Sequence, residues 1–481
     1  MSATESHWPA WLRRHTGVEF LGQPNLFFAR LTIGLSLFAI LFVGGWNAAK
    51  YPLSLGYDAQ PNATYIHILL DEHHIPRPDQ SGEANQPPAY YLVAGVAARL
   101  GHKIFHWSET ETYPGFPEAS FRGALYLNVL LVFLTALCML WLARVVAPDK
   151  PWVWAASVGF FAFLPVVSKT EAMIHPENLS MLTSAVALAA TTHIFVRRTF
   201  SLRLLGLLGL AIGVGLATRT TMFFTLAALV VGTAAALTVR EIRERIPWRR
   251  VAIVFGLMIV LAVPWVAYRG IVSHQGPLNS TSRLFHAALH PGTHTLSDYL
   301  TSHKHFFAIF EPGVFDSPWR SNFKNEALPQ TYTDLWGDWF GAFAWSEYNG
   351  VPTIAAQHVL KDQSYIGLVP TALALGGWLW LCWVAFRRRR ELVVLAVMPI
   401  FGVGGYLYRS WVTLTHDGDL FKATYALNTV TVWALALGLA TAWLASRSRL
   451  ARCGMVVLFA VFAVLELRFM MYGIRDGRPI F

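Results

Sequence analysis

The stretch FFARLTIGLSLFAILFVGGW (residues 27–46) is followed closely by GYDAQPNATYIHILLDEHHIPRPDQSGEANQPPAYY (residues 56–91). The first segment has the ~20 apolar residues that a membrane-spanning helix needs. It follows a polar N-terminal segment and lacks the small-residue cleavage pattern of a signal peptide, so we expect it to be retained. The second segment gathers acids, histidines and a Pro-Pro-aromatic element beside the membrane. A simple anchor needs no such loop, and the junction therefore predicts a membrane protein with a functional loop.

The composition agrees with a membrane protein. The 481 residues are 54% hydrophobic and only 14% charged, whereas soluble domains carry roughly 25% charged residues. The net charge of +10 could suit nucleic acid, but the basic residues punctuate the apolar runs as topology determinants do. We therefore expect no nucleic-acid partner. The three cysteines lie in or beside apolar runs, which argues against a disulfide framework.

The distribution of apolar runs predicts an all-α polytopic membrane protein of about eleven transmembrane helices. The runs are 27–46, 121–145, 151–167, 178–196, 204–217, 221–238, 251–270, 365–386, 392–408, 423–445 and 455–472. The pair 204–217 and 221–238 is short and tightly connected, which suggests two half-length or tilted helices. We see no internal repeat.

Charge alternates between successive connections, and this alternation predicts the orientation. The basic connections contain Arg13 and Arg14; Arg144 and Lys150; Arg197, Arg198 and Arg203; Arg240 to Arg250; Arg387 to Arg390; and Arg447 to Arg452. The positive-inside rule places these in the cytoplasm, with the N-terminus inside and the C-terminus outside. We expect a cytoplasmic segment (1–25), a transmembrane core (26–272) with a first external loop at about 49–120, an external lid (273–364) and C-terminal transmembrane helices (365–481).

The first external loop contains the leading catalytic candidate, Asp58. A carboxylate partly removed from water at a membrane face can have a raised pKa and act as a general base; the alternative is a solvated loop acid. Glu72 and His73 are weak candidates for metal ligands. Residues 83–91, the Pro-Pro segment, begin with Glu83 and contain Gln86 and Tyr90. Its two prolines fix an extended approach to an amphipathic segment at the interface.

Three later positions are candidates for binding a substrate. Glu177 stands in the first turn of an expected helix, where capping alone would explain it. Arg219, in the break between two apolar runs, suits a phosphate ligand, or an interfacial side chain that reaches for water. Lys422, followed by Tyr425, stands where a membrane helix begins; it is a candidate cation or an ordinary interfacial lysine.

The last long loop is rich in aromatic residues and histidines. It contains Trp319, Trp336, Trp339 and Trp345, and His286, His290, His294, His303 and His305. His286 and His290 alone have the i, i+4 spacing of helical zinc ligands, which is weak support for a metal. Aromatic residues suit a carbohydrate or lipid surface, but we favour a small packed lid.

The first loop resembles that of the GT-C superfamily of integral-membrane glycosyltransferases. An Asp after the first span and a later acid-x-x-Gln-Pro-Pro-x-Tyr-Tyr element are similar to the branch of protein O-mannosyltransferases and aminoarabinose transferases. Two positions depart from that branch, because Ala59 replaces a Glu and Ala89 replaces a Leu. The first departure leaves the second acid of the site to Glu72 or Glu83. The resemblance covers about the first 240 residues and the region of Lys422.

The resemblance implies a GT-C-like bundle that uses a polyprenyl-phosphate-linked sugar rather than a nucleotide sugar. Asp58 is then the catalytic base, and the residues expected to bind the donor or acceptor are Glu83, Gln86, Tyr90, Glu177, Arg219, Lys422 and Tyr425. The reaction inverts the anomeric centre and transfers the sugar to a hydroxyl group. Relatives differ in whether they use a divalent metal ion, so that question stays open.

Two other functions remain as alternatives at this stage. A transporter or flippase would place ionisable residues at mid-membrane, whereas here the acids cluster in the loops. A glycan polymerase or ligase acting on a lipid-linked oligosaccharide would use late loop residues such as Arg409 and His416. We expect an enzyme of a bacterial inner membrane with its active site facing outward. The sugar, the acceptor and the oligomeric state are not readable from the sequence.

Overall fold

The structure of the chain is a computed structural model, which describes residues 22–53, 56, 58–105, 121–272, 313–316, 327–336, 354–412 and 422–471. The regular elements within these ranges are all helical. They are α2 (Gly22–Lys50), α3 (Ala59–Asp71), α4 (Ala89–Phe105), α5 (Arg122–Val146), α6 (Pro151–Ala162), α7 (Pro165–Glu171), α8 (Glu177–Arg197), α9 (Leu202–Leu216), α10 (Met222–Leu237), α11 (Arg240–Arg243), α12 (Trp248–Val272), α16 (Ala327–Trp336), α18 (Ile354–Ile366), α19 (Leu368–Arg387), η4 (Arg390–Leu392), α20 (Val393–Val412), η5 (Ala423–Thr429), α21 (Val430–Ala445) and α22 (Arg449–Met470).

Eight of the described helices are long and apolar enough to cross a membrane, and the bent pair α6–α7 makes up to nine. The expected all-α polytopic fold is confirmed, and each expected apolar run lies on helix. The chain is an integral membrane protein. Helices α9 and α10 contain 15 and 16 residues, hence ~22–24 Å at 1.5 Å per residue. This is shorter than the ~30 Å hydrocarbon core, in line with the short pair expected there.

Two expected runs are not continuous α-helix. The run 151–167 bends by 56° between α6 and α7. Pro165 has no N–H and disfavours a helical residue before it, and Leu164 is accordingly extended. The run 423–445 starts as the 3₁₀ segment η5 before continuing as α21. The second of these points, the start of η5, directly follows Lys422, one of the candidate site residues.

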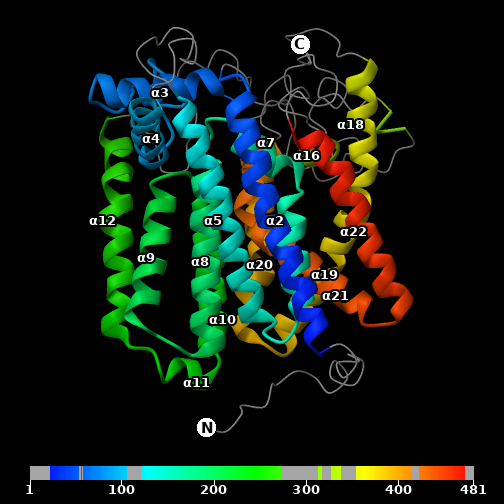
Figure 1. Ribbon diagram of the computed structural model, residues 1–481. Helices are drawn as coiled ribbons and strands as arrows, with labels where there is room; N and C mark the ends of the chain where they lie inside the picture. Colours follow the sequence, from blue (N-terminus) through cyan, green and yellow to red (C-terminus); the bar gives the residue numbers. More distant parts are fainter. Residues whose placement is uncertain are drawn as a thin grey trace.

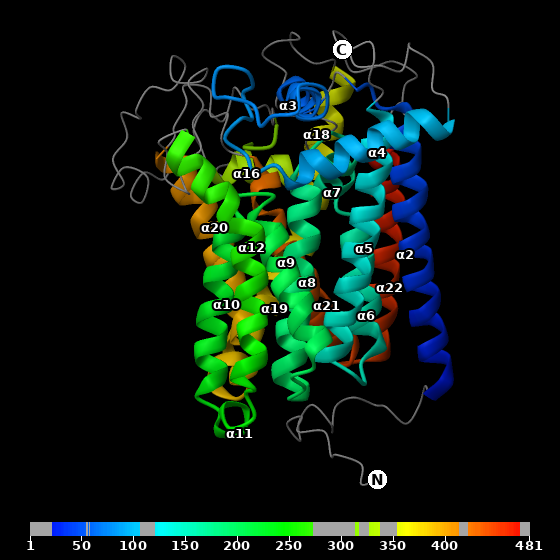
Figure 2. The same cartoon turned by 90° about the vertical axis from the view of Figure 1, so that its left-hand side faces the viewer.

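The long connections meet at one end of the bundle. Helices α3 and α4 lie at the same end as α16 and α18, whereas α11 lies at the opposite end (Figure 1). In the view turned by 90°, α4 lies across the ends of the long helices rather than along them (Figure 2). We call this the α3–α4 end. The first external loop (about 49–120) and the external lid (273–364) were both expected on one side of the membrane, and their described parts lie at this one end.

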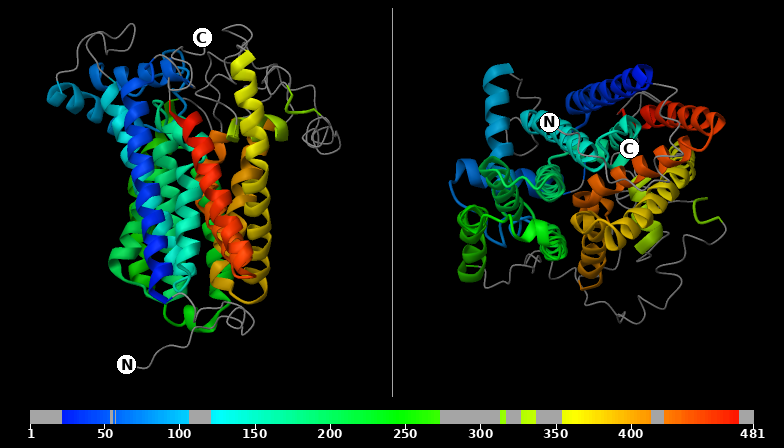
Figure 3. Two further views of the ribbon diagram at one scale, coloured as in Figure 1. Left: turned by 45° about the vertical axis from the view of Figure 1, so that its right-hand side comes forward. Right: turned by 90° about the horizontal axis from the view of Figure 1, so that it is seen from below.

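Helix α8 occupies the centre of the bundle, with 78% of its apolar window buried. It packs against α5, α9 and η5. Two glycines allow neighbouring backbones to approach closely, because a Cβ at Gly123 would meet Ala97 and one at Gly377 would meet Ala436. Small residues serve this purpose in membrane helix packing. Figure 3 shows how the helices surround α8 from the side and along their axes.

Polar contacts fasten the α3–α4 end of the long helices. The Arg122 guanidinium donates to the carbonyls of Ala48 and Tyr51, 2.8 and 2.7 Å away. It thus satisfies carbonyls that the end of α2 leaves without partners. The Asn47 amide donates to the Met470 carbonyl at 2.7 Å, which joins the ends of α2 and α22. The ends that hold the loops are therefore firmly connected.

Candidate functional site

Asp58 stands directly before the first residue of α3. Gly56 and Asp58 both have positive φ, +106° and +54°; Gly tolerates this region freely, and Asp more readily than most residues. The Asp58 carbonyl accepts the first helical bond, from Asn62 N–H at 2.9 Å. Its carboxylate makes no capping bond to the helix. The carboxylate instead faces Lys422, whose Nζ lies 3.3 Å from Oδ2.

Nearby positive charge holds Asp58 ionised. Burial raises the pKa of this carboxyl, but the charges of Lys422, His175 and Arg219 outweigh burial and leave the pKa below its usual value of 3.8. Burial lowers the pKa of His175 to about 3, helped by Arg219, so His175 is neutral at pH 7. Lys422 and Arg219 are then the cations that act at neutral pH. The expectation of a raised pKa at Asp58 was wrong, because sequence spacing did not reveal these neighbours.

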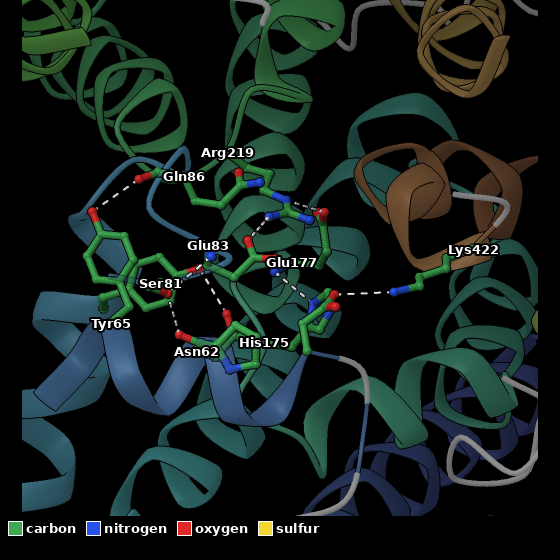
Figure 4. A network of polar contacts seen from close by, with 12 residues as sticks. Asn62, Tyr65, Ser81, Glu83, Gln86, His175, Glu177, Arg219 and Lys422 are labelled. Carbon is green, nitrogen blue, oxygen red and sulfur yellow. Dashed lines mark hydrogen bonds and ion pairs between the residues drawn. The ribbon is translucent and has the colours of Figure 1, made fainter. Parts of the chain in front are cut away.

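Arg219 forms the second group of charges. Its Nε lies 2.7 Å from Glu177 Oε1, and its Nη1 lies 3.5 Å from Glu83 Oε2. The guanidinium carbon stands 5.4 Å from the centre of the Tyr425 ring, within range of a cation–π interaction. Figure 4 shows Arg219 directed at both glutamates, with Lys422 reaching in from the η5 side. The two glutamates outweigh the burial of Arg219 and raise its pKa.

This geometry decides between the alternative interpretations of two residues. Arg219 is 2% exposed, so it is not an interfacial side chain that reaches for water. Glu177 is fully buried, and its carboxylate pairs with Arg219. Capping alone does not account for it. The short α9–α10 pair supplies Arg219, and the start of α8 supplies Glu177.

Gln86 and Tyr90 have structural positions in the Pro-Pro segment. Tyr90 is completely buried; it donates to Asn128 Oδ1 at 3.2 Å and accepts from the backbone N–H of His175 at 2.9 Å. The carbonyl of Gln86 accepts from Tyr65 at 3.1 Å. Ala89 N–H donates to the Ala217 carbonyl at 2.9 Å. These bonds fix the segment against α5 and the end of α9, beside Arg219.

Comparison with known proteins gives a match to solved structures only; no family model and no curated protein matches the chain. The oligosaccharyltransferase of Archaeoglobus fulgidus, tethered to an acceptor peptide, has a TM-score of 0.51 at 11% identity, over 93% of this chain and 55% of that one. ArnT from Cupriavidus metallidurans, bound to undecaprenyl phosphate, has a TM-score of 0.47 at 14% identity, over 91% and 63%.

The chain has the GT-C fold. The likeness to the oligosaccharyltransferase thus confirms the fold expected from the first loop. This chain spans only about half to two thirds of the length of these two proteins, and the likeness concerns architecture rather than activity.

His175 is a further residue of this site, to which the sequence pattern alone gave no role. Its ring is 1% exposed, and its Nδ1 accepts from the Glu177 N–H at 3.4 Å. Both Asp58 and Arg219 influence its pKa. A histidine two residues before the helix-starting Glu177 was the available signal. A neutral imidazole here separates Asp58 from Glu177 without adding charge.

Glu72 and His73 do not join the site. Both are exposed at the end of α3, and Glu72 Oε2 lies 3.0 Å from His74 Nε2. In the ranges that the structure describes, no group of three or more His, Cys, Asp or Glu side chains has the arrangement of a metal site. The acids of the site face Lys422 and Arg219. The described residues therefore do not fit a bound metal ion, and we derive no step through one.

The expected lid is described only in part. Trp336 is completely buried and packs edge-on against Phe160 and Phe462. Its indole N–H donates to Thr371 at 3.0 Å. This part of the chain packs onto the helices as a lid would. The other tryptophans and the five histidines proposed for this loop, and also His416, lie outside the described residues, as does the side chain of Arg409.

Proposed function

We propose that the chain transfers a sugar from a polyprenyl-phosphate donor to a hydroxyl acceptor at the α3–α4 end, with inversion at the anomeric carbon. The observation that carries this proposal is the pair of Asp58 and Lys422, 3.3 Å apart. An ionised carboxylate and a cation, both partly accessible, adjoin the buried Arg219 group at one face of a membrane bundle. Such a pair suits a reaction that removes a proton while releasing a phosphate.

The proposed reaction is a single in-line displacement. The acceptor oxygen forms a bond to the anomeric carbon as the bond between that carbon and the phosphate oxygen breaks. The hydroxyl proton passes to the Asp58 carboxylate, and the bond electrons leave with polyprenyl phosphate. A general base typically contributes ~10²–10⁴-fold. Because the pKa of Asp58 is low, it mainly aligns the hydroxyl and takes the proton late, as acidity develops.

The cations stabilise the leaving phosphate in this proposal. Lys422 has three donor hydrogens, so its ammonium can contact Asp58 and a phosphate together. Arg219 is held by Glu83, Glu177 and Tyr425, and its charge is largely balanced by the two glutamates, so Lys422 is the main cation for the phosphate. Preorganised charge of this kind often accounts for the largest part of a rate enhancement. Gln86 and Tyr90 position the Pro-Pro segment rather than contact the donor.

We also propose that the α3–α4 end faces outward from a bacterial inner membrane. Basic residues are found at the opposite end, with Arg197 closing α8 and Arg240 and Arg243 in α11. The positive-inside rule assigns that end to the cytoplasm. In this arrangement residues 26–272 form the transmembrane core, 273–364 cover the site from outside, and 365–481 contribute Lys422 and Tyr425.

The test uses purified protein in lipid nanodiscs with a panel of polyprenyl-phosphate hexoses and pentoses. Release of polyprenyl phosphate is followed for the wild type, for Asp58→Asn, and for Asp316→Asn. Asp316 pairs with Lys361 in an exposed contact, so its variant is a matched change of charge away from the site. We expect slow donor hydrolysis in the wild type and in Asp316→Asn, and its loss in Asp58→Asn. The Asp58→Asn protein should remain folded, because a partly exposed ion pair contributes only ~0–1 kcal/mol to stability.

Two outcomes would remove the proposal. Equal turnover by Asp58→Asn would exclude this carboxylate as the base. No turnover of any donor by a folded wild-type protein would shift the assignment to a glycan ligase, tested with lipid-linked oligosaccharides, or to a transporter, tested by movement of the lipid across vesicles.

A further inference from the structure

A second buried ion pair lies behind the candidate site. Lys169 Nζ stands 2.7 Å from Asp334 Oδ1, and the two side chains are only 3% and 1% exposed. The same ammonium donates to the Asp334 carbonyl at 3.3 Å. Removing a lysine and an aspartate from water is costly unless they are paired and further hydrogen-bonded. The proposed transfer reaction does not use either residue, so the presence of this pair needs another explanation.

Asp334 has a further contact that leads to the site. Its Oδ2 accepts a short hydrogen bond from the backbone N–H of Ala423. Ala423 is the first residue of η5 and directly follows Lys422. One carboxylate thus binds the Lys169 ammonium through one oxygen and the start of η5 through the other. This N–H belongs to a helix end, whose donors otherwise lack helical partners.

Three separate segments meet at this carboxylate. Lys169 belongs to α7, the short arm after the bend, which continues into His175 and Glu177. Ala423 begins η5, which carries Tyr425. Asp334 belongs to the last turn of α16, whose final residue, Trp336, packs into the helices. The pair therefore joins α16 to two of the segments that supply the charged groups of the site, the one that leads to Glu177 and the one that begins after Lys422.

We propose that Asp334 is a positioning residue that fixes Lys422 against Asp58, with Lys169 holding the Asp334 carboxylate in place. Lys422 is extended (φ −122°, ψ 126°), and the anchored N–H lies in the peptide that joins it to Ala423. Anchoring this peptide fixes the Lys422 Cα and so the reach of its ammonium. Without the Asp334 acceptor, the start of η5 shifts and the Lys422–Asp58 contact opens. The catalytic importance of this positioning rests on the proposed function. The Lys422–Asp58 contact itself can be measured without turnover.

The test measures the chemical reactivity of Lys422 by competitive acylation and mass spectrometry in nanodiscs, without any donor. Lys422 is 10% exposed and Lys361 is 38% exposed, so Lys361 is an internal reference. Asp334→Asn keeps an acceptor oxygen but removes the negative charge that strengthens the bond from Ala423 N–H and pairs with Lys169. We expect labelling of Lys422 to rise about tenfold, the size expected when a hydrogen bond loses its charge assistance. In the control Glu241→Gln, which removes an exposed acid that pairs with Arg198, labelling of both Lys361 and Lys422 should stay unchanged.

A second variant covers the case in which Asp334→Asn fails to fold. The double substitution Lys169→Met with Asp334→Leu removes both charges, and such a replacement is often neutral for stability. It still removes the acceptor for Ala423 N–H, so Lys422 labelling should rise as well. Wild-type reactivity of Lys422 in the folded double variant would overturn the positioning role and leave a merely structural pair.

The outcomes separate this inference from the proposed function. Increased labelling in a protein that turns over no donor supports the positioning of Lys422 and removes the transferase proposal. Unchanged labelling of Lys422 in the Asp334 variants of an active protein supports the transferase proposal and removes the positioning of Lys422 by Asp334. When the positioning role and the transferase proposal both hold, Asp334→Asn should also shift the acid limb of the pH–rate profile to higher pH. A loss of stability alone would not cause this shift.

Discussion

Replacing Lys422 with methionine should raise the pKa of Asp58 and shift the acid limb of the pH–activity profile to higher pH. In the wild type, burial raises this pKa, but Lys422 is the largest of the opposing influences, and the net result lies below 3.8. Methionine keeps most of the length of the side chain and removes its charge. Burial then acts against Arg219 alone at neutral pH, because His175 is uncharged there.

The size of the shift follows from the distance between the two charges. At the 3.3 Å that separates Nζ from Oδ2, unit charges interact by ~1–5 kcal/mol for effective dielectric constants of ~80 to ~20. At ~1.4 kcal/mol per pKa unit, the expected shift is roughly 1–4 units. With Asp58 22% exposed, solvent screening favours the lower half of this range.

The sign also predicts how stability depends on pH. A carboxyl with a lowered folded pKa stabilises the fold above its unfolded pKa, and this contribution disappears as pH falls through the folded pKa. Wild-type protein should therefore keep the Asp58–Lys422 contribution until the pH falls below 3.8, the usual value. In Lys422→Met this contribution is absent at every pH.

The assay is the pH dependence of kcat/KM for Lys422→Met. The quantity compared with the wild type is the pH at which activity is half-maximal, and not the maximal activity. Lys361→Met, which removes a lysine from an exposed pair, is the control. If turnover is too slow, the infrared absorption of the protonated carboxyl reports the same titration, assigned by its loss in Asp58→Asn. If the acid limb and the carboxyl titration of Lys422→Met both coincide with those of the wild type, the Lys422 charge does not lower the pKa of Asp58 and this reasoning is refuted.

Three further predictions concern stability. Glu177→Gln removes the nearer of the two carboxylates that pair with the buried Arg219, at 2.7 Å, while Glu83 remains at 3.5 Å. It should lower the free energy of unfolding by ~1.5–3 kcal/mol, the size of a hydrogen bond to a charged group, measured by denaturant titration in detergent; a loss below ~1 kcal/mol would contradict a buried pair. Tyr91→Phe removes the bond to Asn62 Oδ1 (2.9 Å) and should cost ~1–3 kcal/mol, while activity below the melting temperature stays within twofold. Gln330→Met removes a fully buried amide that has no partner among the described residues, so the melting temperature should stay equal or rise; a fall would reveal a partner, such as ordered water.

The helices could be predicted from the sequence because length and hydropathy are local properties. An apolar run such as 121–145 has one stable form in lipid, since every backbone group must be satisfied within the segment. The bend inside 151–167 also had a local signal, Pro165, which the count of apolar residues overlooked. The 3₁₀ start of η5 had no such signal. It depends on tertiary contacts, including the bond from Ala423 N–H to Asp334.

The site could be predicted as a set of candidates but not as a set of pairs. Asp58 and Lys422 lie 364 residues apart in the chain, and no pattern in one sequence connects them. The pairing of Arg219 with Glu177 likewise depends on how the α9–α10 turn meets the start of α8. Lys169 carried no signal, because a single lysine beside apolar residues looks like an interfacial side chain. Charges brought together by packing then changed the chemistry, as the lowered pKa of Asp58 shows.

These pairings give the proposed reaction an order of events. Arg219 is held at 2.7 Å by Glu177 and also faces Glu83, whereas Lys422 contacts Asp58 at the longer distance of 3.3 Å. A phosphate that arrives at the site therefore attracts Lys422 more readily than Arg219. As Lys422 turns toward the phosphate, Asp58 loses part of the attraction that lowers its pKa and becomes a stronger base. The carboxylate is thus activated when a donor is present, which limits unproductive proton uptake in its absence.

This order predicts that a lipid phosphate alone raises the pKa of Asp58. The infrared titration of wild-type protein in nanodiscs should shift upward on addition of polyprenyl phosphate, by less than the ~1–4 units expected for complete removal of the lysine charge. Lys422→Met should show no such shift, because the group that transmits it is gone. An equal shift in the variant would mean that the added negative charge acts on Asp58 directly. The coupling through Lys422 would then be wrong, even if Asp58 remained the base.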